Sequence, residues 1–209
     1  TGRNIFNPAI VGRIFLTIAF PKIMTVNWQV PFSSGLGGFA VFQKVDAITS
    51  ATPLALFKSQ GAIASYFDLL IGQSSGCIGE TFRIGLILGG LFLLLTKIVD
   101  WRIPLAYLGS VAGFVFLSNH IFHTKFAPPL FQILSGGLLL GAFFMATDPV
   151  TSPFTKMGRW ISGILLGILT VLIRGLSGYV EGVMFSILLV NAFSPLIDTI
   201  VLKVRYRKK

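Results

Sequence analysis

Six stretches of the sequence are apolar over nearly the length that a helix needs to cross a lipid bilayer, which is about 20 residues with a range of roughly 17 to 25. They are residues 7–20, 81–98, 104–121, 130–145, 160–173 and 181–201. The first is short and contains Arg13, and the fourth ends at an Asp-Pro step, which stops a helix. The pattern predicts an all-α fold, a polytopic transmembrane helical bundle.

The composition agrees with a membrane protein. The residues AVILMFWYC make up 54% of the chain and charged residues 11%, and the mean hydropathy is +0.82, whereas soluble domains contain about 45–50% apolar and about 25% charged residues. The formal net charge of +10 would favour nucleic acid in a soluble domain, but no basic helix face or aromatic platform accompanies it. Membrane lipid is therefore an expected partner, and nucleic acid is not.

Lysine and arginine residues orient the predicted spans. Five positive charges lie in the last seven residues, so the positive-inside rule places this tail, residues 202–209, in the cytoplasm. Counting back through six spans places the long segment 22–79 on the outer side. We expect one membrane domain over residues 1–209. His120 and His123 fall in an external loop with no third ligand nearby, so no metal site is expected.

Two proline-containing segments resemble the ends of discontinuous helices. They are residues 4–8, Asn-Ile-Phe-Asn-Pro, and residues 147–153, Thr-Asp-Pro-Val-Thr-Ser-Pro. Backbone groups freed at such breaks are tolerated at membrane depth only inside protein or beside water. Paired breaks of this kind mark ligand sites in membrane folds built from inverted repeats. Ordinary capping of helix ends explains the same residues, and both interpretations stay open.

The longest polar interval contains the run D-A-I-T-S-A-T-P, residues 46–53. In this run Thr52 is flanked by small side chains and followed by Pro53, which fixes the backbone, so the hydroxyl of Thr52 is accessible. One interpretation is a turn in which Asp46 or Thr49 caps a short helix. The other is an acceptor site, because a transferase needs an unhindered hydroxyl and an acidic group nearby.

The run D-A-I-T-S-A-T resembles the flavinylation motif of the membrane flavoprotein subunits in the Rnf and Nqr respiratory complexes. Four further stretches resemble this family in the same order, and together they cover nearly the whole chain: T-G-R-N-I-F-N-P-A-I-V-G-R-I-F-L, I-G-Q-S-S-G-C-I-G-E-T, M-A-T-D-P-V-T-S-P and G-Y-V-E-G-V-M-F-S-I-L-L-V-N-A-F-S-P-L-I-D. The resemblance is nearest to the D subunit of Rnf, an ion-translocating ferredoxin:NAD oxidoreductase. The alternative is the B subunit of the sodium-translocating NADH:quinone oxidoreductase. Family members carry further N-terminal helices, which this chain is expected to lack.

The resemblance implies that FMN is joined to Thr52 by a phosphoester. Asp46, Thr49, Ser50 and Ala51 would complete the motif, although Thr49-Ser50 stands where the family often has Ser-Gly. The flavin would carry the electrons, and the protein would position it and set its potential, so no catalytic residue is expected.

A second flavin, riboflavin or another that is not covalently bound, is implied near Asn4 and Asn7. Their amides would bond its carbonyl and imide edge, although capping of a helix explains them equally well. Arg13 lies within the first predicted span, where a charge usually has a function or a buried partner. Its candidate partners are a flavin phosphate, Asp148 and Glu181.

The resemblance also implies export of Na⁺ or H⁺ coupled to electron transfer. Asp148, Glu181 and Asp198 are the acids near membrane depth in the C-terminal half, and we expect the ion path there. The implied partners are an external flavin subunit, iron–sulfur subunits and a flavin transferase, in the cytoplasmic (inner) membrane of a bacterium or archaeon. A solute permease or channel without flavin, and a purely structural subunit, are the competing hypotheses.

Overall fold

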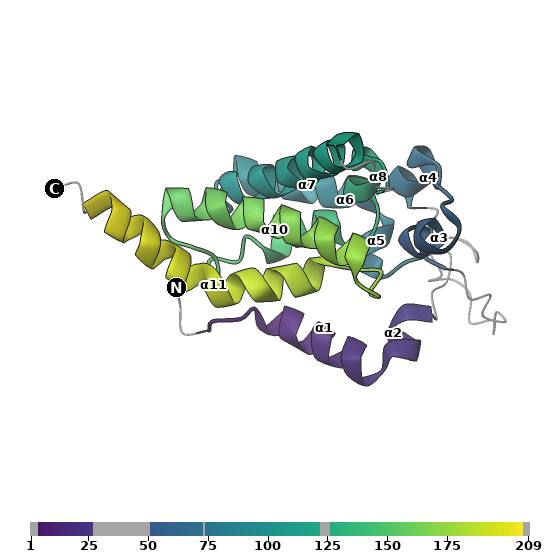
Figure 1. The fold of residues 1–209 in the computed structure, drawn as a ribbon, viewed down its shortest axis with the longest axis horizontal. Helices are drawn as coiled ribbons and strands as arrows, with labels where there is room; N and C mark the ends of the chain where they lie inside the picture. The colour runs from purple at the N-terminus through teal and green to yellow at the C-terminus, as the bar shows by residue number, and fades with distance from the viewer. Residues whose placement is uncertain (1–3, 27–50, 73, 122–125, 207–209) are drawn as a thin grey trace.

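The computed structural model describes residues 4–26, 51–72, 74–121 and 126–206, and every regular element in these ranges is a helix (Figure 1). The predicted all-α fold is confirmed for them. The elements are α1 (Pro8–Ala19), α2 (Pro21–Val26), α3 (Pro53–Gln60), α4 (Tyr66–Ile71), α5 (Ile78–Thr81), α6 (Arg83–Leu95), α7 (Arg102–Ile121), α8 (Pro129–Leu134), α9 (Leu138–Leu140), the π-helix η2 (Gly141–Met145), α10 (Lys156–Leu176) and α11 (Val183–Tyr206).

A helix occupies each of the six predicted intervals, and the fourth interval is divided. Residues 130–145 form α8, α9 and η2, because the chain leaves the helical path at Ser135 and passes through Gly136 at a φ of +65°. Among the described residues, α10 and α11 are the helices that are both long enough and apolar enough to cross a bilayer, while α1 and α6 are apolar but shorter. The number of spans stays a prediction.

The centre of the bundle is the pair α7 and α10, with α11 packed against α10. Glycines let the first two helices approach closely, because a Cβ at Gly163 would lie 3.0 Å from the carbonyl oxygen of Ile103 and one at Gly167 would overlap Ser110. Such small residues at an interface are typical of helix packing in membranes. Further along, the Tyr107 hydroxyl lies 2.6 Å from Thr170 Oγ1 in the buried interior.

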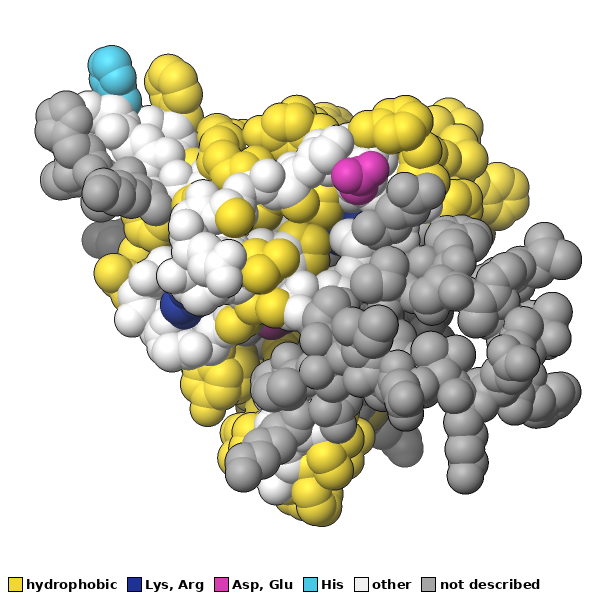
Figure 2. Space-filling view, turned by 90° about the vertical axis from the view of Figure 1, so that its right-hand side faces the viewer, with side chains coloured by type: hydrophobic (Ala, Val, Ile, Leu, Met, Phe, Trp, Pro, Cys, Tyr) yellow, Lys and Arg dark blue, Asp and Glu magenta, His cyan; other side chains and the backbone are white. Residues whose placement is uncertain are grey.

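The flanks of the bundle are hydrophobic and exposed. Phe15 and Ile18 on α1, Leu88 and Phe92 on α6 and Phe116 on α7 each expose between 60% and 67% of their surface. The end-on view in Figure 2 shows hydrophobic side chains gathered around the periphery of the described surface. Exposed apolar surface on this scale marks contact with lipid or protein. Together with the helical fold, it confirms the predicted membrane bundle.

Polar contacts connect the helices at both ends of the molecule. At one end Asp100, between α6 and α7, pairs with Arg102 at 2.7 Å and with Arg159 of α10. Burial alone would raise the pKa of the Asp100 carboxyl, but the hydrogen bonds and charges of the two arginines hold that pKa below its usual range. At the other end Lys58 of α3 donates to the carbonyl oxygens of Ser177 and Tyr179. Figure 1 places α3 and the C-terminus at opposite ends.

The two proline segments are helix ends in the structure. Asn7 caps α1, where its Oδ1 accepts from the Ala9 N–H at 3.0 Å, and the second segment connects η2 to α10. The interruptions that lie inside the bundle are instead between α4 and α5 and between α8 and α9. Arg83, only 1% exposed, joins them by donating to the carbonyl oxygens of Leu69 and Leu134.

Candidate functional site

Thr52 lines a small pocket at the α3 end of the bundle, a cavity of about 70 Å³. Many parts of the chain contribute to it: α1, α2, the start of α3, α5, the α8–α9 link, the α10–α11 link and the start of α11. Its charged lining residues are Arg13, Glu80 and Glu181. The pocket therefore brings the Thr52 hydroxyl together with one cation and two carboxyl groups, whereas most of the surrounding core is apolar.

Thr52 is the N-cap of α3. Its backbone is extended, with φ −64° and ψ 152°, and its Oγ1 accepts from the Ala55 N–H at 3.3 Å. Pro53 takes the first helical position, where the missing N–H costs no hydrogen bond. The preceding carbonyl, that of Ala51, accepts from the Ser75 hydroxyl at 2.6 Å. These contacts hold the half-buried hydroxyl at the N-terminus of an eight-residue helix.

Arg13 forms an ion pair with Glu80 across the pocket, at 3.2 Å between Nη2 and Oε1. Glu80 is nearly buried, with 8% of its side chain exposed, whereas Arg13 exposes 26%. Cys77 completes this group, because its thiol donates to Glu80 Oε1 at 3.1 Å. Burial and the neighbouring Glu80 carboxylate raise the pKa of the Cys77 thiol to about 12, so the thiol keeps its proton.

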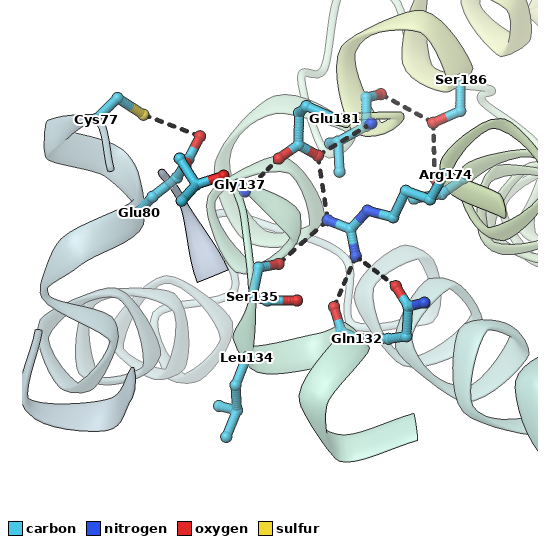
Figure 3. A network of polar contacts seen from close by, with 12 residues as sticks. Cys77, Glu80, Gln132, Leu134, Ser135, Gly137, Arg174, Glu181 and Ser186 are labelled. Atoms are coloured by element: carbon cyan, nitrogen blue, oxygen red, sulfur yellow. Dashed lines mark hydrogen bonds and ion pairs between the residues drawn. The ribbon is translucent and has the colours of Figure 1, made fainter. Parts of the chain in front are cut away.

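The second carboxylate belongs to a network around Arg174 (Figure 3). Glu181 accepts from Arg174 Nη2 at 3.1 Å and from the backbone N–H of Gly137 at 3.0 Å. Arg174 also donates to the carbonyl oxygen of Gln132 at 2.7 Å, to the side-chain oxygen of Gln132 at 3.0 Å and to the carbonyl oxygen of Ser135 at 3.1 Å. These carbonyls end α8, so the guanidinium stabilises the interrupted helix.

The α8–α9 link separates the two acids of the pocket. Gly136 lies against the Glu181 carboxylate, and a Cβ on Gly137 would lie 3.6 Å from Glu80 Oε1. Two glycines in succession thus let the backbone pass between the carboxyl groups, each of which has its own arginine. Because Gly136 has a positive φ, a side chain at this position would be strained as well as crowded.

The other predicted site residues lie away from this pocket or outside the described residues. Asp46, Thr49 and Ser50 belong to the undescribed range 27–50, and Ala51 is exposed beside Thr52. Asn4 and Asn7 lie at the start of α1, where Asn7 caps the helix. The second flavin stays a prediction.

The three acids of the predicted ion path have different environments. Asp148 accepts from the Val150 N–H and from the Thr151 hydroxyl within its own turn. Asp198 accepts from the backbone N–H groups of Phe154 and Thr155 at the start of α10. Of the three, Glu181 is the one that lines the pocket with Thr52. Participation of these acids in ion transport stays a prediction.

Sequence reasoning missed Glu80, Arg83 and Gln132 as site residues. The signal that could have identified Glu80 and Arg83 is their charge within a glycine-rich, apolar segment, G-C-I-G-E-T-F-R, since charges at membrane depth need a partner. Arg13 was expected to pair with a flavin phosphate, Asp148 or Glu181, and its partner in the structure is Glu80.

Comparison with known proteins identifies the family to which the chain belongs. The model of the NQR2, RnfD, RnfE family matches residues 1–207. This chain belongs to that family. The D subunit of the proton-translocating ferredoxin:NAD(+) oxidoreductase complex of Clostridium ljungdahlii is 41% identical over 98% of this chain. The D subunit of the Na(+)-translocating ferredoxin:NAD(+) oxidoreductase complex of Acetobacterium woodii is 40% identical over 94%. The B subunit of the Na(+)-translocating NADH-quinone reductase of Ectopseudomonas mendocina is 38% identical over 100%.

These relatives are longer than the chain. It spans 62% of the Clostridium protein, 57% of the Acetobacterium protein and 52% of the Ectopseudomonas protein. The predicted resemblance to the Rnf and Nqr family is confirmed, with both types among the relatives.

Proposed function

We propose that this chain is part of an electron-transferring membrane subunit in an Rnf-type ferredoxin:NAD oxidoreductase, and that it carries FMN on Thr52. The names of the relatives support the type of complex. The observation that carries the cofactor assignment is the pocket in which Thr52, at a helix N-terminus, faces Arg13. Electron transfer through the flavin drives export of Na⁺ or H⁺ in this proposal.

The residues around Thr52 fit a phosphoester. A phosphate on Oγ1 would lie at the N-terminus of α3, where the positive end of the helix dipole favours an anion and the Ala55 N–H already points at Oγ1. The Arg13 guanidinium uses Nη2 for Glu80 and Cys77 and has further N–H groups to donate to phosphate oxygens. Bound in this way, FMN supplies the electron chemistry, while Arg13 and α3 hold its phosphate.

Attachment of the flavin uses the Thr52 hydroxyl as the nucleophile. Its oxygen would form a bond to the flavin phosphorus while the pyrophosphate bond of a flavin dinucleotide breaks, so that the hydroxyl proton is released and a nucleoside monophosphate leaves. The half-buried position of Thr52 suits this reaction, since the hydroxyl is reachable from outside the bundle. The α3 end then faces the outer compartment, in agreement with the predicted orientation of the basic tail.

The proposed setting is a cytoplasmic membrane in a bacterium or archaeon, crossed several times by the chain. The partners are other subunits of the complex, including an external flavin subunit and iron–sulfur subunits. Glu80 and Glu181 line the Thr52 pocket. A cation or proton that enters beside the flavin would meet these two carboxyl groups first.

The experiment is an intact mass of the complete subunit, purified within its complex from cells that contain the flavin transferase. The wild type is expected to carry the mass of one covalent FMN, and a denaturing gel under ultraviolet light is expected to show a fluorescent band. Both signals disappear in Thr52→Ala and persist in Thr17→Val, a control in the same pocket. A fluorescent Thr52→Ala band would refute attachment at this residue.

A further inference from the structure

A second, larger cavity adjoins the Thr52 pocket along α3. Its volume is about 490 Å³, within the range of about 300–1,000 Å³ that is usual for small-molecule sites. Leu54 and Val180 line both cavities, so they form the boundary between them. Phe57 and Phe126 are among its apolar walls. The cavity has the size and the aromatic lining expected for a flat organic ring.

The polar wall of this cavity contains a hydrogen-bond donor, the side-chain amide of Gln132. Gln132 is 3% exposed and lines the cavity. Its side-chain oxygen accepts from Arg174 Nη1 at 3.0 Å, which fixes the orientation of the amide because a guanidinium can only donate. The amide nitrogen, drawn without a dashed line in Figure 3, has no hydrogen-bond partner within the part of the chain that the structure describes.

Arg174 lines the same wall, but its unused donor is not exposed to the cavity. Its Nε is buried and has no partner among the described residues, although both terminal nitrogens are bonded. Lys58, which also lines the cavity, already donates to three backbone carbonyls. A ligand that complements this wall therefore carries acceptors, such as ring carbonyls, because a buried donor without an acceptor is unfavourable.

We propose that this cavity receives the isoalloxazine ring of the flavin attached at Thr52, and that a carbonyl of the ring accepts from the amide nitrogen of Gln132. This inference rests on the proposed function. The path is short, because α3 runs from Thr52 along the cavity wall to Lys58, six residues and thus about 9 Å further along the helix. The phosphate stays beside Arg13, and the five-carbon ribityl chain passes Leu54 and Val180.

Two variants of the complete subunit, each purified in its complex, test the ring position. Gln132→Leu removes the donor at similar volume, and infrared difference spectra are expected to show a flavin carbonyl band at higher frequency. Val180→Phe fills the boundary between the cavities, and quenching of flavin fluorescence by iodide is expected to rise severalfold as the ring is displaced into solvent. Val150→Phe, on an exposed turn away from the cavity, serves as the matched control and is expected to match the wild type.

The intact mass separates the two proposals. If the wild type lacks the FMN increment, the proposed function fails and the ring assignment fails with it. If the increment is present, and both the carbonyl band and iodide quenching are unchanged in Gln132→Leu and Val180→Phe, the ring assignment alone is overturned. A carbonyl shift in Gln132→Leu with full FMN loading supports it independently of electron-transfer activity.

Discussion

Gly136 lies directly against the carboxylate of Glu181, in a backbone conformation with a φ of +65°. A Cβ at this position would overlap Glu181 Oε2 and approach Arg174 Nη2 to 3.0 Å. We predict that Gly136→Ala lowers the free energy of unfolding by about 2–4 kcal/mol, from left-handed strain and from disruption of the ion pair. Thermal unfolding of the purified protein in detergent measures this loss.

Gly61→Ala separates the two contributions to that loss. Gly61 also has a positive φ, +70°, but nothing lies within 4 Å of its added Cβ. It is expected to cost about 1–2 kcal/mol, the strain alone. Equal losses in the two variants would show that the contact with Glu181 contributes nothing.

Loss of the Glu80 charge is expected to destabilise the α1 side of the Thr52 pocket. Glu80→Gln leaves the half-buried Arg13 without its acid, and we predict a loss of about 1–3 kcal/mol in the free energy of unfolding. A double-mutant cycle with Arg13→Gln isolates the pair, since the second substitution should then cost less than it does in the wild type. Additive losses would mean that the observed pair at 3.2 Å contributes no coupling.

Lys58 connects α3 to the end of α10. Its ammonium donates to the carbonyl oxygens of Arg174 at 3.3 Å, Tyr179 at 2.9 Å and Ser177, where the negative end of the helix dipole adds to the attraction. Lys58→Met is expected to speed hydrogen–deuterium exchange of residues 177–181 severalfold, with about 1–2 kcal/mol lost. Lys203→Met, at an exposed position of α11, is the control, and equal exchange in both variants would contradict this role.

The ion pairs of Asp100, at the opposite end of the bundle, are expected to make the stability of the folded protein depend on pH. Its pKa is lowered in the folded protein, so the stabilisation is present above the unfolded value of about 3.9 and is lost as pH falls through the folded value. Asp100→Asn is therefore expected to lower the melting temperature at neutral pH, and the difference from wild type is expected to shrink below about pH 4. A difference that stays constant down to pH 2, measured in acid-stable detergent, would exclude this ion pair as its source.

The positions of the helices were predictable because each reflects a local property, a run of apolar residues between charged or proline-containing breaks. The division of the fourth interval was not. The pattern of Ser135-Gly136-Gly137 is compatible with a continuous apolar helix. The helix is interrupted there because the Gly137 N–H donates to the carboxylate of Glu181, which lies 44 residues further along the chain. A hydropathy pattern gives no information about a contact between residues so far apart in the sequence.

The candidate site was predictable in part for the same reason. Thr52 and Arg13 stood out through a local motif and a charge in an apolar span, and the structure brings both to one pocket. Glu80 did not stand out, because its partner Arg13 is 67 residues away. Asp198 was selected for its depth and its charge, whereas in the structure it accepts from the backbone N–H groups that begin α10.

The glycine seam between α7 and α10, at Gly163 and Gly167, restricts how these two helices can shift relative to each other. At Gly163 the backbone and Ala106 of α7 lie close to α10, and at Gly167 the Ser110 side chain fills the space, so a slide of one helix past the other would meet close packing. By contrast, α1 packs against α11, and among the described residues its ion pair is the one between Arg13 and Glu80. A displacement of α1 would alter the wall of the cavity beside Thr52, because Arg13 and Thr17 belong to that wall.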